Sequence, residues 1–347
     1  MFRIREATSA DNEALLQLEA QSPQGTGISI LIDRDDYFYR SRLHDRNTVL
    51  IAEEDDRLVG IMAFAIKEVL LDGEPERVAY FYDLRGEASY RRSMKRGLFR
   101  LWKACLAEME GEGAAFIYGQ VKSDNSDSMQ IATKMDAKIG ATFNILSLPG
   151  LPGGADELDD HLEDLEGEIA RLDRHVGIRS LRPCDFGTAY RRGAELGYLR
   201  GIFRIEKGGS SAQVSAWDLS KIYRGRVLRM PTSLLALGVF LNPLATFLPV
   251  PRLPKVGEQL TYLQLFDPVC EGADGVALLK TLIQRLRRKA LADGIDILAL
   301  FVYQDDPLVP HMPRFYPQKV MHYHTMVRPC GSDELPERPL YLDIRDI

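Results

Sequence analysis

The first and second halves of this chain share sequence features at a nearly constant separation. Similar strand starts, a glycine that opens a helix, and a polar residue that follows a strand occur in the same order in both halves. Self-similarity of this kind indicates two copies of one structural unit with small insertions. The paired positions lie 174, 178 and 180 residues apart, and they are Ile4 and Ile178, Gly97 and Gly275, and Asn125 and Asp305.

Each copy has the residue pattern of an α/β unit. Apolar runs typical of strands alternate with segments in which apolar residues recur at three- and four-residue spacing, as in amphipathic helices. The first copy predicts strands at 2–6, 48–52, 58–70, 78–82, 114–121 and 141–148, with helices that begin near 8, 98 and 125. The second copy predicts strands within 214–230 and at 234–241, 260–266, 295–303 and 319–327, with a helix from Gly275.

This order predicts an α/β fold (α+β, mixed sheet) of two similar domains, each a mixed central sheet flanked by helices. We expect the first domain at 1–148 and a more divergent second domain at 177–347. The linker, 149–176, contains an acidic amphipathic helix from about 155 to 174. Its apolar seam covers only two heptads, which favours a helix docked between the domains over an oligomerisation rod.

Composition restricts the partners and the compartment. The 347 residues carry a net charge of −6, which disfavours nucleic acid as the main partner. The four cysteines are scattered without CxxC spacing, so we expect a reducing, cytoplasmic location and no metal. His322 and His324 share a face of the last predicted strand, but two histidines do not complete a coordination shell. The N-terminus lacks the apolar core of a signal peptide.

The apolar segment 233–250 is close in length to a membrane span, but Asn242-Pro243 interrupts it. We expect two buried strands or an apolar wall here, and no membrane partner. Binding of a lipid-like acyl chain or of a membrane surface is the weaker alternative. The net charge of −6 would oppose membrane recruitment unless a basic patch faced the bilayer.

The stretch 77–103 has the pattern of an anion site. An apolar strand, 78–82, is followed by the basic turn Arg91-Arg92-Ser93-Met94-Lys95-Arg96-Gly97 and then by an amphipathic helix. Backbone N–H groups at a helix start lack intrahelical partners, and the helix dipole there favours negative charge. Four cationic side chains in one turn favour a polyphosphate ligand. The alternative is that they form a solvated basic face.

These segments resemble the GNAT superfamily of acyl-CoA-dependent N-acyltransferases. The family loop, Arg/Gln-x-x-Gly-x-Gly/Ala at a helix start, is matched in part, with Arg91 or Arg92 leading and Gly97 closing. Downstream, Asn125-Ser126-Asp127-Ser128 and 134–140 match the family's Asn-x-x-Ala/Ser helix and its lysine-containing end. The resemblance covers about 2–148 and recurs more weakly at 178–328, which indicates a tandem GNAT protein.

The resemblance implies a cytoplasmic N-acetyltransferase that uses acetyl-CoA as co-substrate and a small-molecule or peptide amine as acceptor. It places the CoA-binding groups in the first half and the thioester carbonyl near the end of the strand 78–82, at about Asp83, Leu84 and Arg85. Asp83 or Glu87 is the implied base, with a salt bridge to Arg85 or another arginine as the alternative role of Asp83. The implied cofactor-binding residues are Leu84, Arg85, Arg91, Arg92, Arg96, Gly97 and Asn125.

The family's thiolate acid is a tyrosine, and the two halves differ at that position. The first half has Ala132 there, so either the first half does not catalyse, or water protonates the thiolate, or Tyr80, Tyr82 or Tyr118 substitutes. The second half offers Tyr316, with a packed aromatic as the alternative, but Glu271 and Asp274 in its loop would repel a pyrophosphate.

A degenerate tandem that senses acyl-CoA or supports a partner without turnover is therefore the alternative function. The acceptor, the acyl chain length, the active half and a homodimer stay open. Asp33, Asp35 and Asp36 would suit a cationic amine, and an exposed acidic loop explains them equally well.

Overall fold

The computed structural model describes the chain except for residues 22–27, 45, 88–94, 154–157, 246, 249, 307, 316–317, 332–333, 335 and 347. The first half contains β1 (Phe2–Glu6), α1 (Asn12–Ala20), β2 (Ser29–Asp33), β3 (Arg46–Glu54), β4 (Arg57–Leu71), β5 (Glu74–Gly86), α2 (Lys95–Gly111), β6 (Phe116–Lys122), α3 (Ser126–Lys134) and β7 (Lys138–Pro149). Its short 3-10 helices are η1 (Ser9–Asp11) and η2 (Tyr37–Arg42).

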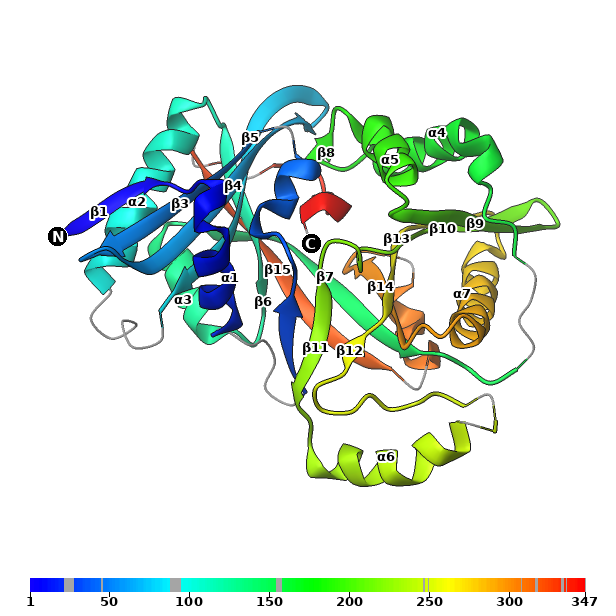
Figure 1. Cartoon of the computed structure of the whole chain (residues 1–347). Helices are drawn as coiled ribbons and strands as arrows, with labels where there is room; N and C mark the ends of the chain where they lie inside the picture. Colours follow the sequence, from blue (N-terminus) through cyan, green and yellow to red (C-terminus); the bar gives the residue numbers. More distant parts are fainter. Residues whose placement is uncertain are drawn as a thin grey trace.

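The second half repeats much of this order (Figure 1). It contains η3 (Leu162–Asp164), α4 (Leu165–Val176), β8 (Arg182–Pro183), α5 (Phe186–Glu195), β9 (Leu199–Lys207), β10 (Ser210–Trp217), β11 (Arg224–Arg229), α6 (Thr232–Ala245), β12 (Gln259–Leu260), β13 (Tyr262–Glu271), α7 (Gly275–Ala292), β14 (Ile297–Tyr303), η4 (Val309–Phe315), β15 (Lys319–Pro329) and η5 (Ile344–Asp346).

Among the described residues, twelve strands form one continuous mixed sheet. Its order is β1-β3-β4-β5-β6-β15-β7-β14-β13-β10-β9, with β8 paired to β4. The pairs β5–β6 and β13–β14 are parallel and the other pairs are antiparallel. The predicted mixed sheet with flanking helices is confirmed.

The last strand of each repeat pairs with the other repeat. β15 lies beside β6, and β7 lies beside β14, while β15 and β7 pair with each other at the centre. The order β3-β4-β5-β6-β15 from one side of the sheet therefore corresponds to the order β9-β10-β13-β14-β7 from the other side. Two segments more than 170 residues apart in sequence complete each other's sheet.

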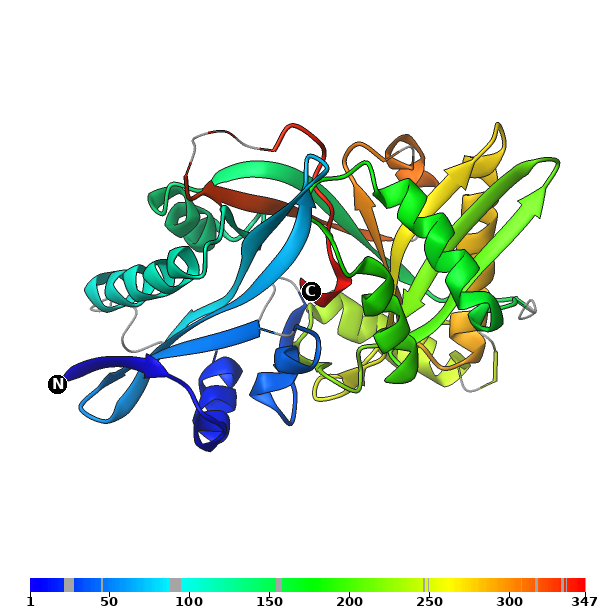
Figure 2. The same ribbon diagram turned by 90° about the horizontal axis from the view of Figure 1, so that it is seen from above.

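Apolar residues cover both faces of this sheet. In the first half α2 packs on one face with Leu101, Trp102 and Cys105 fully or nearly fully buried, and α1 covers the other face. In the second half α7 takes the place of α2, while α4 and α5 cover the opposite face. Viewed from above, α2 and α7 lie toward opposite ends of the molecule (Figure 2).

Two sequence predictions of local structure are wrong. Residues 232–245 form the helix α6, and not strands, because leucine and alanine dominate the segment and favour a helix. Most of its side chains are exposed, so the segment is no buried wall. The acidic helix begins at Leu165, later than expected, and packs mainly on α5 within the second half.

A second, three-stranded sheet joins the halves. β2 of the first half pairs with β11, and β11 pairs with β12. The helix α6 connects β11 to the segment that returns to β12. None of the helices in the described part of the chain is both long and apolar enough to cross a membrane.

Candidate active site

The strand β5 contains a β-bulge at the position where the resemblance implies a thioester site. Tyr82 pairs with Ala63, but the next pair along the strand joins Arg85 to Ile61. Asp83 and Leu84 therefore oppose a single residue of β4, and Asp83 has a φ of 51°. Asp tolerates this left-handed conformation better than most residues, and a bulge of this kind redirects the strand.

Parallel pairing between β5 and β6 ends just before this bulge. It covers three residue pairs and stops at Tyr80–Tyr118. At the next position a Cβ on Gly119 would lie 2.7 Å from the carbonyl oxygen of Phe81, so only glycine fits there. The two strands thus come close at Gly119 and leave the β5 bulge without β6 ladder partners. Unpaired backbone groups there are available to a ligand.

The helix α2 begins at Lys95, shortly after β5 ends. Its buried apolar face packs on β4, which fixes its N-terminus relative to the bulge. Gly97 lies half-buried in the first turn, and no acidic residue occurs in that turn. Arg91 and Arg92 lie outside the described residues, and so does the side chain of Arg96.

Asp83 and Arg85 form a buried ion-pair network with α1 and the segment after β2. Arg85 donates to Asp83 at 3.0 Å and to Glu19 at 2.8 Å, and the hydroxyl of Tyr37 donates to Asp83 at 3.2 Å. Arg34 pairs with Glu19 and lies 3.9 Å from Asp83. Burial by itself would raise the pKa of Asp83, but Arg85, Arg34 and Arg40 hold that pKa well below its usual range.

The other implied residues of the first half lie apart from this network. Glu87 is buried and pairs with Arg57. Leu84 packs against the core under α2. Asn125 caps α3 and accepts a hydrogen bond from the backbone of Ser128 at 3.1 Å. The structure thus brings Asp83, Leu84 and Arg85 together at the bulge, and it places Asn125 at the start of a different helix.

The second half contains the same bulge. Val269 pairs with Gln213 and Phe266 with Ser215, so Asp267 and Pro268 oppose one residue. Asp267 also has a φ of 51°. It accepts hydrogen bonds from the hydroxyls of Tyr190 at 2.5 Å and Tyr341 at 3.0 Å. Burial raises its pKa from 3.8 to about 6.

Aromatic rings pack together beside the bulge of the second half. Phe266 of β13 stacks on Phe301 of β14 with ring centroids 4.1 Å apart, and Phe143 of β7 stacks on Phe301 at 6.4 Å. At the start of α7, the backbone N–H of Asp274 donates to Ser210 at 3.2 Å. Glu271 accepts a hydrogen bond from Ser211 at 2.8 Å. Tyr316 lies outside the described residues.

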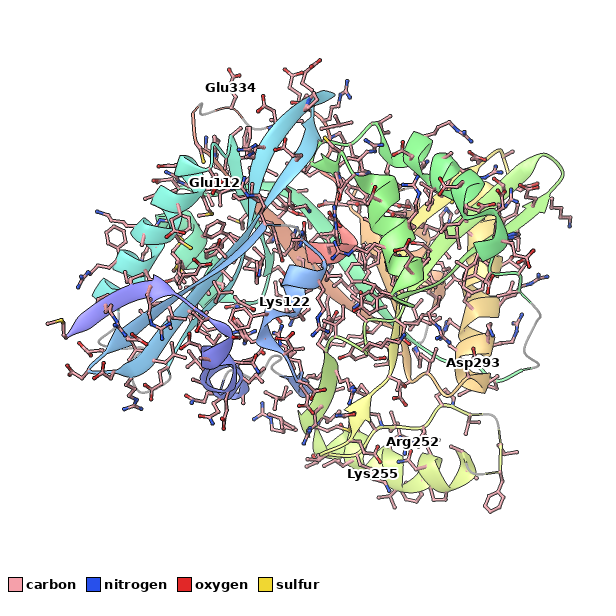
Figure 3. All side chains as sticks on the ribbon, turned by 45° about the horizontal axis from the view of Figure 1, so that its top comes forward. Glu112, Lys122, Arg252, Lys255, Asp293 and Glu334 are labelled. Atoms are coloured by element: carbon pink, nitrogen blue, oxygen red, sulfur yellow. The ribbon has the colours of Figure 1, made fainter. Side chains whose placement is uncertain are left out.

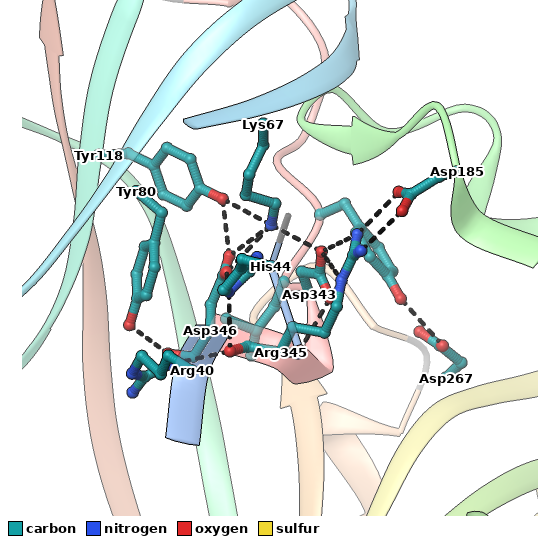
Figure 4. Close-up of polar contacts among 12 residues, drawn as sticks. Arg40, His44, Lys67, Tyr80, Tyr118, Asp185, Asp267, Asp343, Arg345 and Asp346 are labelled. Carbon is teal, nitrogen blue, oxygen red and sulfur yellow. Dashed lines mark hydrogen bonds and ion pairs between the residues drawn. The ribbon is translucent and has the colours of Figure 1, made fainter. Parts of the chain in front are cut away.

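A buried polar cluster joins β4 and β6 to the C-terminal segment (Figure 4). Lys67 of β4 donates to Asp343 at 2.6 Å, to Asp346 at 3.0 Å and to the hydroxyl of Tyr118 at 3.0 Å. The hydroxyl of Tyr118 donates to Asp346 at 2.6 Å. Burial raises the pKa of Tyr118 well above its usual range, and burial also raises the pKa of Asp346 despite Lys67.

This cluster connects to the bulge network through Arg40. Its guanidinium lies over the ring of Tyr82, 4.4 Å from the centroid, and donates to the carbonyl oxygen of Arg345 at 2.8 Å. Lys67, Asp343, Asp346 and Arg40 are not among the residues predicted from the sequence. The local signal for Lys67 is its position after a long apolar run within β4.

A small cavity of about 80 Å³ opens on the other side of the C-terminal segment. It lies between α5, the start of β9 and Leu43 of the first half. Asp185 at its wall pairs with Arg345 at 2.8 Å.

Asp33, Asp36 and the two histidines singled out from the sequence have partners within the protein. Asp33 pairs with Arg226, and Asp36 accepts from Arg42 at 2.8 Å. His322 bonds to Asn144 at 2.6 Å and His324 to Thr142 at 3.0 Å. Among the described residues, no group of three His, Cys, Asp or Glu side chains could hold a metal ion.

Comparisons with known proteins assign a domain family to part of the first half. Residues 3–123 match the family model of the acetyltransferase (GNAT) domain. No curated protein matches the chain. The N-myristoyltransferase of Saccharomyces cerevisiae with bound myristoyl-CoA has a TM-score of 0.58 and 12% identity, over 96% of this chain and 84% of that chain.

Two further solved structures cover a similar share of the chain. Eis1 from Mycobacterium abscessus covers 95% of this chain and 73% of its own, with 15% identity and a TM-score of 0.47. A probable N-acyltransferase from Enterococcus faecalis covers 95% and 73%, with 11% identity and a TM-score of 0.46.

The resemblance to the GNAT superfamily is confirmed. Residues 3–123 match the GNAT domain model, and the fold of the whole chain is similar to that of the N-myristoyltransferase.

Proposed function

We propose that this protein transfers an acetyl or other acyl group from acyl-CoA, acetyl-CoA in the simplest case, to an amine. The CoA pyrophosphate would bind at the basic loop 91–97, through Arg91, Arg92, Arg96 and Gly97. The observation that carries the proposal is the Asp83 bulge, which lies free of β6 and directly ahead of α2. Backbone groups of Leu84 and Arg85 would hold the thioester carbonyl, and Asn125 would contact CoA from α3.

One contrast between the halves supports binding in the first half. The helix start of the second half has Glu271 and Asp274, which disfavour a pyrophosphate, whereas α2 begins within a run of cations. We therefore propose that the second half supplies structure and part of the acceptor site.

Acyl transfer requires one proton to leave the amine and one to reach the thiolate of CoA. Asp83 and Glu87 are the candidate bases from the sequence, but the arginines around Asp83 hold its pKa well below the usual range, which makes it a weak base. We propose Asp346 as the alternative acceptor, because its raised pKa makes the carboxylate a better base.

Tyr118 is the proposed proton donor to the thiolate. Its raised pKa keeps the hydroxyl protonated, and Lys67 lies 3.0 Å away to replace the donated proton. One proton thus enters the cluster at Asp346 and one leaves it at Tyr118, so the cluster ends with its original charge. Tyr316 would take this role only if the second half bound the cofactor.

The alternative function is an acyl-CoA sensor that binds without turnover. The motivation is the loss of two loop glycines at positions 94–96 and of the family tyrosine at Ala132. The two functions differ in one observable, because an enzyme releases free CoA in the presence of some amine and a sensor releases none.

The test is calorimetric titration of CoA and acetyl-CoA into wild type, Arg92→Glu and Asp274→Lys, with Lys207→Glu as a surface control. We expect one site, an affinity about tenfold or more lower in Arg92→Glu, and no change in Asp274→Lys or Lys207→Glu. Binding that is altered only by Asp274→Lys would move the cofactor to the second half. No binding in wild type would contradict both functions.

A further inference from the structure

The helix α6 presents an apolar surface that the rest of the protein leaves uncovered. Val239 and Phe240 are each 72% exposed, and Phe247, just after the helix, is 86% exposed. Further exposed apolar side chains on the helix and beside it are Leu235, Leu237, Leu244, Leu248 and Val256. Soluble proteins rarely expose a contiguous apolar patch of this kind without a binding role. α6 is the outermost element at the bottom of Figure 1.

This surface is held in place by the opposite side of the helix. Leu234 packs into a small core with Val227 and Met230. Near the end of α6, the side chain of Asn242 makes two hydrogen bonds of 2.9 Å with the backbone of Leu253. The helix and its return segment are thereby fastened to the small β2–β11–β12 sheet. The exposed face is a fixed feature of the structure and not a loose end.

The charges around the helix are arranged in an unusual way. Residues 230–251 contain no charged side chain. The flanking segments carry five cations and one anion between 224 and 258, a net charge of +4, which leaves −10 for the rest of a chain whose total is −6. Four of these cations are exposed: Arg224, Arg229, Arg252 and Lys255. Figure 3 shows Arg252 and Lys255 on the return segment beside α6.

We propose that the segment 224–258 docks on the surface of an anionic lipid bilayer, with α6 lying in the interface. Apolar side chains of the helix would enter the acyl boundary, while the flanking cations would contact lipid phosphates. The net negative charge of the remaining chain would keep other faces away from the same surface, so that docking occurs in one orientation.

The helix cannot span the bilayer. Its 14 residues reach about 21 Å, whereas the hydrocarbon core is about 30 Å thick. The polar Asn242 and the proline Pro243 interrupt the apolar run near the end of the helix, which agrees with a position in the interface.

A second copy of the chain is a poorer occupant of this surface. A two-fold dimer through α6 would bring the same flanking cations of both copies together, whereas an anionic lipid surface offers them opposite charge. Docking of residues 224–258 on a bilayer does not depend on which half of the chain binds CoA.

The test is co-sedimentation of the full chain with two kinds of vesicle, pure phosphatidylcholine and phosphatidylcholine mixed with phosphatidylglycerol. We expect binding to the mixed vesicles that weakens with added salt, and little binding to the neutral ones. Val239→Glu with Phe240→Glu should lower binding by about a hundredfold, and Arg252→Glu with Lys255→Glu by about tenfold or more.

Matched controls carry the same changes elsewhere on the surface. Ile178 is 66% exposed, so Ile178→Glu tests an apolar-to-acidic change away from α6, and Arg200→Glu with Lys207→Glu tests charge reversal on β9. Both controls should bind vesicles as wild type does. Absence of wild-type binding, or equal loss in the controls, would overturn the proposal. A wild-type dimer that Val239→Glu with Phe240→Glu dissociates in sedimentation velocity would also overturn it in favour of a second copy.

Discussion

Asp83 and Asp267 show how the surroundings of one residue set its chemistry. Both lie at the bulge of the corresponding strand with a φ of 51°. Both are buried, and burial alone raises the pKa of a carboxyl. Asp83 faces three arginines, which hold its pKa well below the usual range, whereas Asp267 has two tyrosine hydroxyls and a pKa raised to about 6. The same position therefore holds a charged carboxylate in the first half, and in the second half it holds a carboxyl group with a pKa of about 6.

The first prediction concerns Asp267→Asn. The folded protein binds the Asp267 proton more tightly than the unfolded chain does, so this group loses stability as pH rises from about 4 to about 6. The free energy of unfolding of Asp267→Asn should gain about 3 kcal/mol relative to wild type between pH 4 and pH 7. Urea unfolding across this range measures the difference. A difference that stays constant with pH would contradict the raised pKa.

Asp83→Asn should show the opposite dependence. The lowered pKa of Asp83 means that its stabilisation is present at neutral pH and is lost as pH falls below about 4. Removing the carboxylate also leaves Arg34 and Arg85 less well compensated, which costs about 3–5 kcal/mol at pH 7. Urea unfolding at pH 7 tests this. The control is Asp136→Asn, because Asp136 has a φ of 59° but is exposed, and there the cost should stay below about 0.5 kcal/mol.

At the scale of elements, the site depends on how β5, β6 and α2 meet. The bulge and the end of β5–β6 pairing come from strand contacts, and the packing of α2 on β4 sets where its N-terminus lies. At Gly119 the backbone of β6 lies so close to the Phe81 carbonyl of β5 that a Cβ would be 2.7 Å from its oxygen. A side chain at Gly119 would push β5 and β6 apart next to the β5 bulge.

Gly119→Ala should therefore impair both stability and cofactor binding. The added methyl would meet the Phe81 carbonyl oxygen at 2.7 Å, and relief of such overpacking costs about 1–3 kcal/mol. We expect that loss in urea unfolding together with weaker CoA binding in calorimetry. Gly111→Ala is the control, since nothing lies within 4 Å of its added Cβ and alanine favours the helix. Equal behaviour of the two variants would contradict the close approach.

At the scale of the whole molecule, the two repeats are interleaved. β7 and β15 each pair with the other repeat, and β2 joins the small sheet of the second half. The C-terminal segment lies at the centre, where Lys67 of the first half binds Asp343 and Asp346 (Figure 4). We therefore propose that the units expected at 1–148 and 177–347 fold together and not separately.

The prediction is a single unfolding transition reported equally by both halves. The chain has two tryptophans, and the buried Trp102 and Trp217 lie in different halves. Fluorescence of Trp102→Phe reports the second half, and fluorescence of Trp217→Phe reports the first. Each should follow the same urea curve as the circular dichroism of the same variant. Separate midpoints within one variant would show that the halves unfold independently.

The amino-acid sequence alone predicts the repeated strand and helix order, the mixed sheet and the GNAT resemblance, whereas α2 begins at Lys95, inside the stretch predicted as a basic turn. Each of these depends on local periodicity or on short motifs, which a single sequence displays directly. The resemblance implies a site near Asp83, but it does not predict the bulge. The pairing register between two strands cannot be read from the sequence of one strand.

How these pieces combine depends on contacts between distant parts of the chain. The exchange of β7 and β15, the contacts of Lys67 with residues 276 and 279 positions away, and the exposure of α6 depend on partners distant in sequence. Residues 233–250 were misassigned for the same reason. An apolar run signals that something must cover it, but whether that cover is the protein's own core or an outside surface is decided by where the fold places the run.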